Sequence, residues 1–546
     1  MAIVKARRKA EVATGPAAIA RWALLPDAIF LLGLTAVGSI AMFWRLGRSS
    51  LYDWDEATYA EIAREIGIFH DWIHLHWNFM PWFNKPPLYI WLTALLFQFG
   101  PSTFTARAVS ALSGIGVLAV AYLIGRRLHG RLVGALAAVV VLCAYQFVVG
   151  ARTGQSDMLL TLTIWLALYA YLRTEDGGRL WWYAAGAFTG LALLTKGPAA
   201  LVAPITIVIA LLIEGRAPKA IRSRHVWGAL ALALAIAIPW HAAQLIHDGT
   251  TFLGQYFGYM VIRRAATPLE GHTGTPLTYL IWLRNQFFPW AYLLPFAFLA
   301  YVRHMPGRRS GRWVIVVFPA LVLGLYSVVA SKLLWYMLPI YPALGLLVAA
   351  LLVDALRGER FAQLSFLAAI AAAVLLVPRS LAPPPPLWLA AAIVIACLLG
   401  AWAWRSRRSV AGPLLILASL FFVALSIQHL APAYRAGPSP VVAIADTVKA
   451  TTQVRQPVLL LIGDRQHVTD YEVSHSLIFY SHRPVRVVIG PDALSAITAC
   501  SRAQPVVLPR VDLDLVATQA DITVLADRFP FVYGVLEGGR PGDCVA

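Results

Sequence analysis

The chain has 546 residues, of which 59% are hydrophobic and 13% charged, and its mean hydropathy is +0.68. Soluble domains carry roughly 25% charged residues, so this composition excludes a water-soluble enzyme, a disordered tail protein and a nucleic-acid-binding protein. The 45 Lys and Arg residues against 27 Asp and Glu give a net charge of +18. The composition predicts a polytopic membrane protein, in which basic residues report the side of the bilayer that each loop faces.

Long apolar stretches predict the membrane-spanning helices, because crossing the hydrocarbon core takes roughly 17–25 apolar residues. The first stretch, 26–44, follows a basic start and has no small-residue cleavage site, so we expect a retained signal anchor. The other stretches lie at 87–99, 105–125, 132–150, 157–173, 180–195, 198–213, 226–246, 278–302, 312–330, 333–355, 361–377, 387–404 and 411–430.

The stretch 87–99 is the exception, because it is short, opens with two prolines and is rich in aromatic residues. We expect it to lie in the membrane interface rather than to cross. With Met1 in the cytoplasm, the arginine-rich loops then all face the cytoplasm, as the positive-inside rule requires. These loops are 125–131, 214–225, 303–312 and 405–409, and the same side also holds the segment 1–25 and the loops 173–179 and 356–360. The count becomes about thirteen spans, with the C-terminus on the periplasmic face.

From about residue 432 the composition changes, because acidic residues appear between short apolar runs. These runs predict strands at 457–462, 484–489, 505–510, 522–527 and 531–536. We therefore expect a membrane domain over 1–431, with periplasmic loops 45–104 and 247–277, and a periplasmic α/β domain over 432–546. An oxidising compartment would allow Cys500 and Cys544 to pair, a question that the sequence leaves open.

Two carboxylates open helix-like runs on the predicted outside face. Asp55 precedes the run 57–66, and Asp157 stands immediately before the apolar stretch 158–173. Each could be only a helix N-cap, a position that Asp favours. Because the topology puts both on one membrane face, they could instead form an acid/base pair. The sequence leaves both interpretations open.

Basic residues on the face where positive charge is disfavoured give a second signal. Lys85 precedes two prolines, Lys196 stands in a tight turn between two spans, and Arg263 and Arg264 lie in the loop 247–277. A lone Lys beside an apolar run commonly extends to the membrane interface without further function. Several such groups recur in different loops, which favours a bound phosphate over contact with acidic headgroups.

Histidine spacing suggests a metal site, with an alternative. His70, His74 and His76 lie close in sequence, as zinc ligands often do. The interleaved Trp72 and Trp77 favour an aromatic belt at the membrane interface instead.

Glu270 and His272 are further candidates for a divalent cation in the loop 247–277. The chain has no Walker motif, HExxH, GxSxG or CxxC. A nucleotide-fuelled or hydrolytic mechanism therefore has no support, and we expect no organic cofactor.

Five sequence blocks resemble the polyprenyl-phosphate-dependent glycosyltransferases of the GT-C superfamily, and most closely the ArnT family, with the protein O-mannosyltransferases as wider relatives. The blocks are DEATYAEIAREI (55–66), HLHWNFMPWFNKPPLYIW (74–91), ARTGQSDMLL (151–160), LTKGP (194–198) and LLWYMLPIYPAL (333–344). Two positions depart from the family pattern: Thr58 stands where Arg is frequent, and Asn84 where Glu is frequent. These departures leave the sugar open.

The resemblance implies a GT-C fold and an inverting transfer of 4-amino-4-deoxy-L-arabinose from undecaprenyl phosphate to a phosphate of lipid A. This reaction would take place at the periplasmic face of a bacterial inner membrane and would confer polymyxin resistance. The resemblance also implies a role for Asp55 near the anomeric carbon, with Asp157 as its partner.

The same resemblance implies how the polyprenyl phosphate is held. Lys85 and an Arg of 263–264 would bind the phosphate, and Tyr59 and Tyr341 could donate hydrogen bonds to it. A lipid A phosphate is already anionic and needs little help from a base. We therefore expect Asp55 to orient the sugar or the acceptor, and Lys85 to stabilise the departing phosphate.

Two alternatives compete with this reading. A protein O-mannosyltransferase using polyprenyl-phosphate mannose would need Asp55 as a base, because its acceptor is a Ser or Thr hydroxyl. A lipid-linked sugar transporter would carry its charged groups near mid-membrane. The candidate residues gather at one face instead, which disfavours the transporter.

Overall fold

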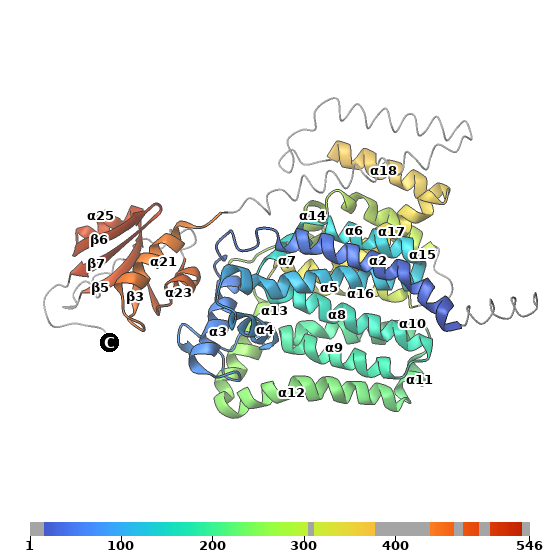
Figure 1. Cartoon of the computed structure of the whole chain (residues 1–546), viewed down its shortest axis with the longest axis horizontal. Coiled ribbons are helices and arrows are strands. Elements are labelled where there is room, and N and C mark those ends of the chain that lie inside the picture. The colour runs from blue at the N-terminus through green and yellow to red at the C-terminus, as the bar shows by residue number, and fades with distance from the viewer. Residues whose placement is uncertain (1–15, 304–310, 377–436, 464–472, 491–502, 538–546) are drawn as a thin grey trace, which may run out of the picture.

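A computed structural model describes residues 16–303, 311–376, 437–463, 473–490 and 503–537. In these ranges the chain forms a bundle of long helices and a separate five-stranded sheet (Figure 1). The predicted spans 387–404 and 411–430, the domain boundary at 432, and Cys500 and Cys544 lie outside the described residues.

The helix bundle is built from apolar segments that run side by side (Figure 1). Its helices are α2 (Pro16–Phe43), α5 (Thr103–His129), α6 (Arg131–Leu142), α7 (Tyr145–Arg152), α8 (Ser156–Arg173), α9 (Leu180–Lys196), α10 (Val202–Ile213), α12 (Arg224–Phe252), α14 (Thr278–Gln286), α15 (Leu294–Arg303), α16 (Trp313–Val328), α17 (Tyr341–Leu356) and α18 (Arg360–Leu376). The central helices α8 and α17 are almost entirely buried and α5 is mostly buried, whereas α2 and α12 expose many apolar side chains.

Five helical segments of the described chain are long and apolar enough to cross a membrane, and a sixth is added if α6 and α7, bent by 69°, form one span. These segments are Pro26–Phe43, Thr103–His129, Leu180–Ile213, Arg224–Ala266 and Leu334–Leu356. The chain is thus a multi-pass membrane protein, as predicted. The count of about thirteen spans stays a prediction.

The segment Leu180–Ile213 doubles back on itself. The start of α9 and the end of α10 both lie beside the end of α8, since Trp181 contacts Tyr169 and Arg216 pairs with Glu175 at 2.6 Å. The reversal occurs at Lys196, where the 3-10 turn η2 (Gly197–Leu201) joins the two helices. The predicted turn at Lys196 is confirmed, and its place between two membrane passes stays a prediction.

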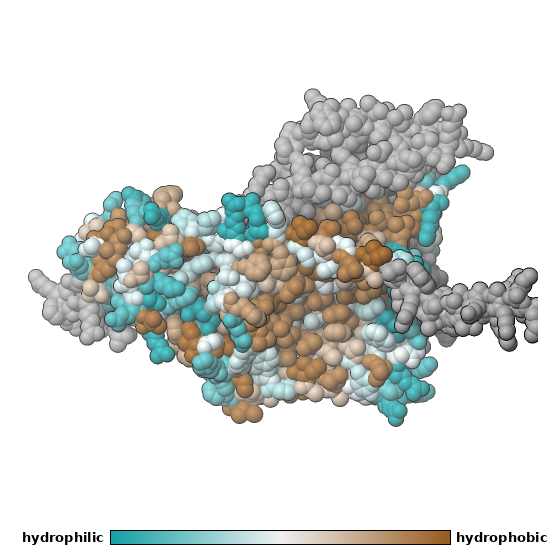
Figure 2. All heavy atoms as spheres, viewed as in Figure 1, coloured by the Kyte–Doolittle hydropathy of each residue, from teal (hydrophilic) through white to brown (hydrophobic). Residues whose placement is uncertain are grey.

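Surface hydropathy follows this arrangement. Figure 2 shows hydrophobic residues over the side of the bundle, with hydrophilic residues at the end near the sheet and at the opposite end around α11 (Ala217–Ile221). On α2, Leu32 is 71% exposed and Ile40 is 66% exposed. Exposed aliphatic side chains on two-turn spacing fit contact with lipid.

The charged loops predicted to face the cytoplasm meet in the structure. Arg127, at the end of α5, pairs with Asp176 at 2.6 Å. Arg131, at the start of α6, pairs with Asp27 at 2.9 Å. Loops assigned to one face from charge alone therefore do lie together.

Short elements occupy the other end of the bundle. They are α3 (Asp55–Phe69), the two-stranded β1 (His76–Trp77) and β2 (Met80–Pro81), and α4 (Leu88–Phe97). The ten residues of α4 are too few to cross a bilayer, which agrees with the expectation that 87–99 does not span.

The C-terminal sheet has the order β4-β3-β5-β7-β6. Its strands are β3 (Val458–Ile462), β4 (Val485–Ile489), β5 (Gln504–Pro509), β6 (Asp521–Arg528) and β7 (Phe531–Glu537). The first three are parallel and the last two add antiparallel. The helices α21 (Pro440–Thr451) and α23 (Ser474–Ser481) pack with it. All five predicted strands and the α/β character of this region are confirmed.

Candidate functional site

The first turns of α3 and α8 bring Asp55 and Asp157 to the same end of the bundle. Neither residue is a helix cap: the N-cap positions belong to Trp54 and Gln155, and no side chain bonds the free N–H groups there. The N-cap interpretation of both carboxylates is therefore wrong. Each carboxylate sits one or two residues inside its helix, where the positive end of the helix dipole favours its charge.

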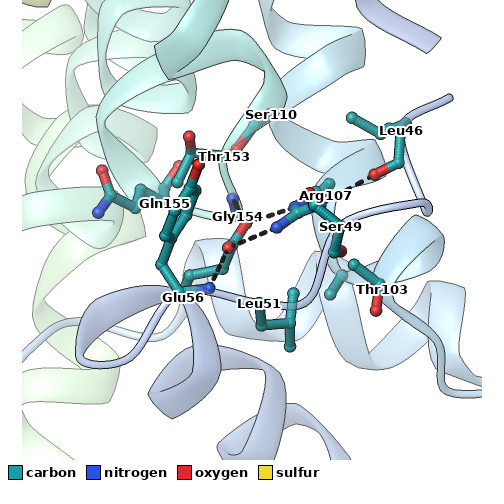
Figure 3. Close-up of polar contacts among 12 residues, drawn as sticks. Leu46, Ser49, Leu51, Glu56, Thr103, Arg107, Ser110, Thr153, Gly154 and Gln155 are labelled. Carbon is teal, nitrogen blue, oxygen red and sulfur yellow. Dashed lines mark hydrogen bonds and ion pairs between the residues drawn. The ribbon is translucent and has the colours of Figure 1, made fainter. Parts of the chain in front are cut away.

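A buried ion pair holds these two helix starts in place (Figure 3). Arg107 of α5 donates to both oxygens of Glu56, at 2.7 and 2.8 Å, and both side chains are almost completely buried. Arg107 also donates to the Ser49 carbonyl oxygen at 3.0 Å. Glu56 Oε1 accepts the Gly154 N–H at 2.5 Å. Because Glu56 follows Asp55 and Gly154 lies three residues before Asp157, one carboxylate positions both.

Gly154 packs closely against its neighbours at this junction. A Cβ atom there would lie 3.1 Å from the Ala106 carbonyl oxygen and 3.1 Å from Glu56 Cγ. The close approach lets the backbone N–H reach the Glu56 carboxylate, a role that glycine allows because it has no side chain.

Lys196 approaches Asp157 from the C-terminal end of α9. Its Nζ lies 2.5 Å from Asp157 Oδ1, with both side chains less than a tenth exposed. Lys196 also lies over the ring of Tyr336, 5.4 Å from its centroid. A lysine at a helix C-terminus facing an aspartate at a helix N-terminus satisfies both helix dipoles.

Lys85 lies between the small hairpin and α4, near the same charges. Burial among protein atoms and the neighbouring Lys196 lower the pKa of Lys85 to about 8, while Asp55 and Asp157 act in the opposite direction. Within the described ranges no carboxylate forms a direct ion pair with Lys85. Its charge is therefore available to an anionic ligand.

The two arginines of the loop 247–277 behave differently. Arg264 is buried and donates to Glu270 at 2.8 and 2.9 Å. It is close enough to Lys85 to influence its pKa. Arg263 is exposed and lies over the ring of Tyr259, 5.6 Å from its centroid. Of the two predicted candidates, the structure brings only Arg264 into the group.

Among the described residues, three buried polar atoms of this group have no hydrogen-bond partner. They are Tyr59 Oη, Ser156 Oγ and Asp157 Oδ2. Tyr59 lies close to Asp55, Asp157 and Ser156, so these atoms share one small region. Buried polar atoms are almost always satisfied in folded proteins. Their clustering beside cations indicates a site for a polar ligand.

Tyr341 is not part of this group of charges. It is fully buried in the bundle, and its hydroxyl donates to Gln146 Oε1 at 2.7 Å. Tyr336, in the 3-10 segment η5 (Leu334–Ile340), lies near Lys196, Arg264 and the two aspartates instead. The sequence block that contains Tyr341 therefore places Tyr336, and not Tyr341, beside these charges.

The predicted cation candidates Glu270 and His272 are not arranged as a metal site. Glu270 is engaged by Arg264, and His272 Nε2 lies 3.9 Å from Glu270 Oε2. Across the described ranges, no third His, Cys, Asp or Glu side chain joins them in a group able to hold an ion. The Glu270 carboxylate binds Arg264 instead of a cation, because hydrogen bonds between a guanidinium and a carboxylate are strengthened by their opposite charges.

The C-terminal region touches the same end of the bundle. Ser476 of α23 donates both its backbone N–H and its hydroxyl to Asp53, at 2.9 and 2.8 Å. His475 stacks on Trp77 and contacts Trp54, with ring centroids 4.9 and 5.1 Å apart. Burial lowers the pKa of His475 to about 4, so its ring is neutral. This region therefore packs beside the start of α3.

Sequence reasoning missed several residues of the site. Glu56 and Arg107 pair across 51 positions, and no local pattern links them. Ser156 and Tyr336 stand inside the quoted blocks GQSD and LLWYM. The same blocks point instead to Asp157 and Tyr341, because a carboxylate and a Tyr-Pro pair are stronger signals in a sequence.

Comparison with known proteins gives a match over a range that includes residues of this site. A sequence profile of the dolichyl-phosphate-mannose-protein mannosyltransferase family matches residues 84–242, a range that includes Lys85, Asp157 and Lys196. An undecaprenyl phosphate-alpha-4-amino-4-deoxy-L-arabinose arabinosyl transferase of Pseudomonas fluorescens is 30% identical over 382 residues, covering 67% of this chain and 63% of that protein. The enzyme of the same name from Shewanella sediminis is 29% identical and covers 58% of each. The chain thus spans about three fifths of the length of these relatives.

Solved structures share the fold. ArnT from Cupriavidus metallidurans bound to undecaprenyl phosphate superposes with a TM-score of 0.70 at 21% identity, over 94% of this chain and 99% of that one. An oligosaccharyltransferase of Archaeoglobus fulgidus gives a TM-score of 0.53 at 12% identity, over 90% and 71%. These likenesses confirm the predicted GT-C architecture with its C-terminal sheet region.

Proposed function

We propose that this chain, which belongs to the ArnT family of GT-C glycosyltransferases, transfers 4-amino-4-deoxy-L-arabinose from undecaprenyl phosphate to a phosphate of lipid A. One observation carries the proposal: Lys85, Lys196 and Arg264 converge on Asp55 and Asp157 at one end of a membrane-spanning bundle. Cations beside unpartnered buried polar atoms fit a phosphate and a sugar better than they fit a purely structural network.

The cations hold the donor phosphate in this proposal. Lys85 has no carboxylate paired to it within the described residues, so it contacts a phosphate oxygen directly. Lys196 and Arg264 are already paired with Asp157 and Glu270 and add to the positive potential. As the bond between the sugar C1 and the phosphate oxygen breaks, negative charge grows on the departing polyprenyl phosphate. Lys85 stabilises that charge.

The carboxylates orient the sugar and the acceptor. A lipid A phosphate oxygen attacks C1 from the face opposite the leaving group, and the polyprenyl phosphate leaves with the bonding electrons. No proton has to be removed from an ionised phosphate, so Asp55 is not needed as a strong base. Its proposed partners are the sugar amino group or its hydroxyls. Asp157, through Oδ2, and Tyr59 supply further hydrogen bonds.

The orientation of the chain is part of the proposal. The site lies opposite the loops rich in arginine, such as 125–131 and 214–225. The positive-inside rule puts those loops in the cytoplasm. The site and the C-terminal region then face the periplasm from the inner membrane.

The experiment is expression in a Gram-negative host that lacks its own aminoarabinose transferase but makes the lipid-linked donor. Mass spectrometry of extracted lipid A should show a species heavier by one aminopentose with the wild-type chain. It should show none with Lys85→Ala, provided that this variant is present in the membrane at the wild-type level. Unmodified lipid A with the wild-type chain would refute the proposed acceptor or sugar.

A second candidate rests on the profile match over residues 84–242. It is transfer of mannose from a polyprenyl phosphate to a Ser or Thr hydroxyl. That acceptor must lose a proton, so Asp55→Asn would abolish it. Glycopeptide analysis of periplasmic proteins from the same host separates this activity from lipid A modification.

A further inference from the structure

A second group of ligating side chains lies outside the site of the aspartates and lysines. His74 comes from the loop before β1, and His247 and Asp248 come from the end of α12. One ligand atom from each lies within 4.8 Å of the others, and no other group of this kind is present in the described ranges. The rings of His74 and His247 are 4.0 Å apart, centroid to centroid. His70 and His76, the predicted companions of His74, are not members.

The loop partner of His74 fixes which ring nitrogen is free. Asp71 Oδ2 accepts from His74 Nδ1 at 2.9 Å, and Asp71 Oδ1 accepts the backbone N–H groups of Ile73 and His74, each at 2.9 Å. A proton on Nδ1 leaves the lone pair on Nε2. A carboxylate behind a histidine is the usual second layer of a metal site, because it orients the ring and raises its basicity.

Hydrogen bonds from side chains of α12 hold the loop of His74 against that helix. Trp240 Nε1 and Gln244 Nε2 both donate to the Ile73 carbonyl oxygen, at 3.0 and 2.7 Å. His247 and Asp248 follow Gln244 by three and four residues, so they lie on the same face of α12. Gly249, with φ 50° and ψ −121°, breaks the helix immediately afterwards. The loop that carries His74 is therefore held next to His247 and Asp248 by these hydrogen bonds, without a metal ion.

We propose that His74, His247 and Asp248 bind one divalent transition-metal ion of the zinc type. Two imidazoles and a carboxylate form a donor set that zinc prefers, whereas magnesium and calcium prefer oxygen donors. Ligands bound to zinc at about 2.0–2.2 Å lie closer together than the present separation. Rotation of His247, whose side chain is 62% exposed, closes the set. The fourth position is left for water.

The ion would clamp the loop 70–77 to the end of α12. The segment that follows, η3 (Leu253–Arg263), leads directly to Arg264. The clamp therefore acts on the position of a cation of the proposed donor site. Metal binding itself does not depend on the proposed transfer activity.

The test uses the full-length protein in detergent, with its affinity tag removed and its metal stripped by a chelator. Zinc titration against a chromogenic competitor should give one site, and cobalt should give the visible absorption of a tetrahedral ion. His247→Ala should weaken zinc binding at least about 100-fold, and Asp71→Asn about 10–100-fold. His272→Ala, in the other cation candidate, should leave binding unchanged.

Thermal unfolding supplies a readout that does not need activity. Zinc should raise the unfolding temperature of the wild-type chain and of His272→Ala but not that of His247→Ala, because only a folded site binds the ion. His247 is exposed, so its loss should not prevent folding. No binding to the wild-type chain, or equal binding by His247→Ala, would overturn the proposal. Loss of lipid A modification with zinc binding intact would count against the proposed function alone.

Discussion

Lys196 and Asp157 form a buried ion pair that joins the last residue of α9 to the first turn of α8, with 2.5 Å between Nζ and Oδ1. The second oxygen of Asp157 has no hydrogen-bond partner in the part of the chain that the structure describes. One oxygen of this carboxylate is therefore structural, and we expect the other oxygen to face the proposed ligand. We expect Asp157→Asn to reduce transfer more than it reduces the amount of folded protein, since asparagine keeps an acceptor toward Lys196. Activity per folded molecule measures this difference.

Lys85 should impose a pH limit on donor binding. Burial and Lys196 lower its pKa to about 8, so its positive charge is lost as pH rises through that value. The KM for the lipid-linked donor should rise above about pH 8 in the wild-type chain. Lys85→Arg should remove this rise, because a guanidinium stays charged. A wild-type KM that is flat from pH 7 to 9.5 would contradict the assignment.

Lys85→Ala should lower kcat by at least about 10²–10³-fold, the usual loss when one charge-stabilising donor is removed, so that its product falls below detection by mass spectrometry. The matched control is Lys219→Ala, in α11 at the opposite end of the bundle. That variant should keep wild-type kinetics. Equal losses in both would point to a general effect on folding.

Arg107→Ala should destabilise the protein by about 3–5 kcal/mol, because it leaves the buried Glu56 carboxylate without its counter-charge. Arg127→Ala, on the same helix, removes a partly exposed ion pair with Asp176. It should cost about 0–1 kcal/mol. Denaturation of both variants in the same detergent compares them, and similar losses would argue against a structural role for the Glu56 pair.

Gly197 should not tolerate a side chain. Its φ is +55°, and a Cβ atom there would collide with the Tyr256 hydroxyl. Gly197→Ala should therefore displace Lys196 and reduce transfer. Tyr256→Phe removes the oxygen and should rescue part of the loss, leaving the backbone strain of about 1–2 kcal/mol. Gly215→Ala, with φ +68° and open space around it, should show the strain alone.

Glu65 should make stability fall as pH rises. It is fully buried beside Glu61, and burial and that neighbouring carboxylate raise its pKa far above 4.5. The folded state holds a proton that the unfolded chain releases above about pH 4.5, so stability is complete below that pH and is lost as pH rises toward the folded pKa. Each pH unit in this window should cost up to about 1.4 kcal/mol.

Glu65→Gln should flatten this dependence, because glutamine keeps an acceptor for the Phe79 N–H without titrating. Unfolding temperatures at pH 5.5, 7 and 8.5 measure the slope for both proteins. A wild-type slope no steeper than that of Glu65→Gln would show that Glu65 is ionised in the folded state.

Local signals predicted the parts of the molecule that depend on neighbours in sequence. The tail strands follow from short apolar runs between polar turns, and the Lys196 turn follows from Lys-Gly-Pro between two apolar stretches. Charge counting grouped the loop of Arg127 with that of Asp176, and the structure joins them. These features are set by solvation and by backbone preference, which a sequence displays directly.

Contacts distant in sequence were beyond such reasoning. The Glu56–Arg107 pair depends on how α3 packs on α5. The choice of Tyr336 over Tyr341 depends on which side of η5 faces the charges. Asp55 and Asp157 looked like caps because a sequence shows a helix start only to within a residue or two. In each case the deciding quantity is a tertiary distance.

The most direct test of the central claim is transfer by the purified protein. The reaction contains undecaprenyl phosphate-linked 4-amino-4-deoxy-L-arabinose and lipid A, and mass spectrometry follows the acceptor. We predict a lipid A product heavier by one aminopentose with the wild-type chain, together with released undecaprenyl phosphate, and neither product with Lys85→Ala. Unmodified lipid A with folded wild-type protein, or equal product from Lys85→Ala, would contradict the account.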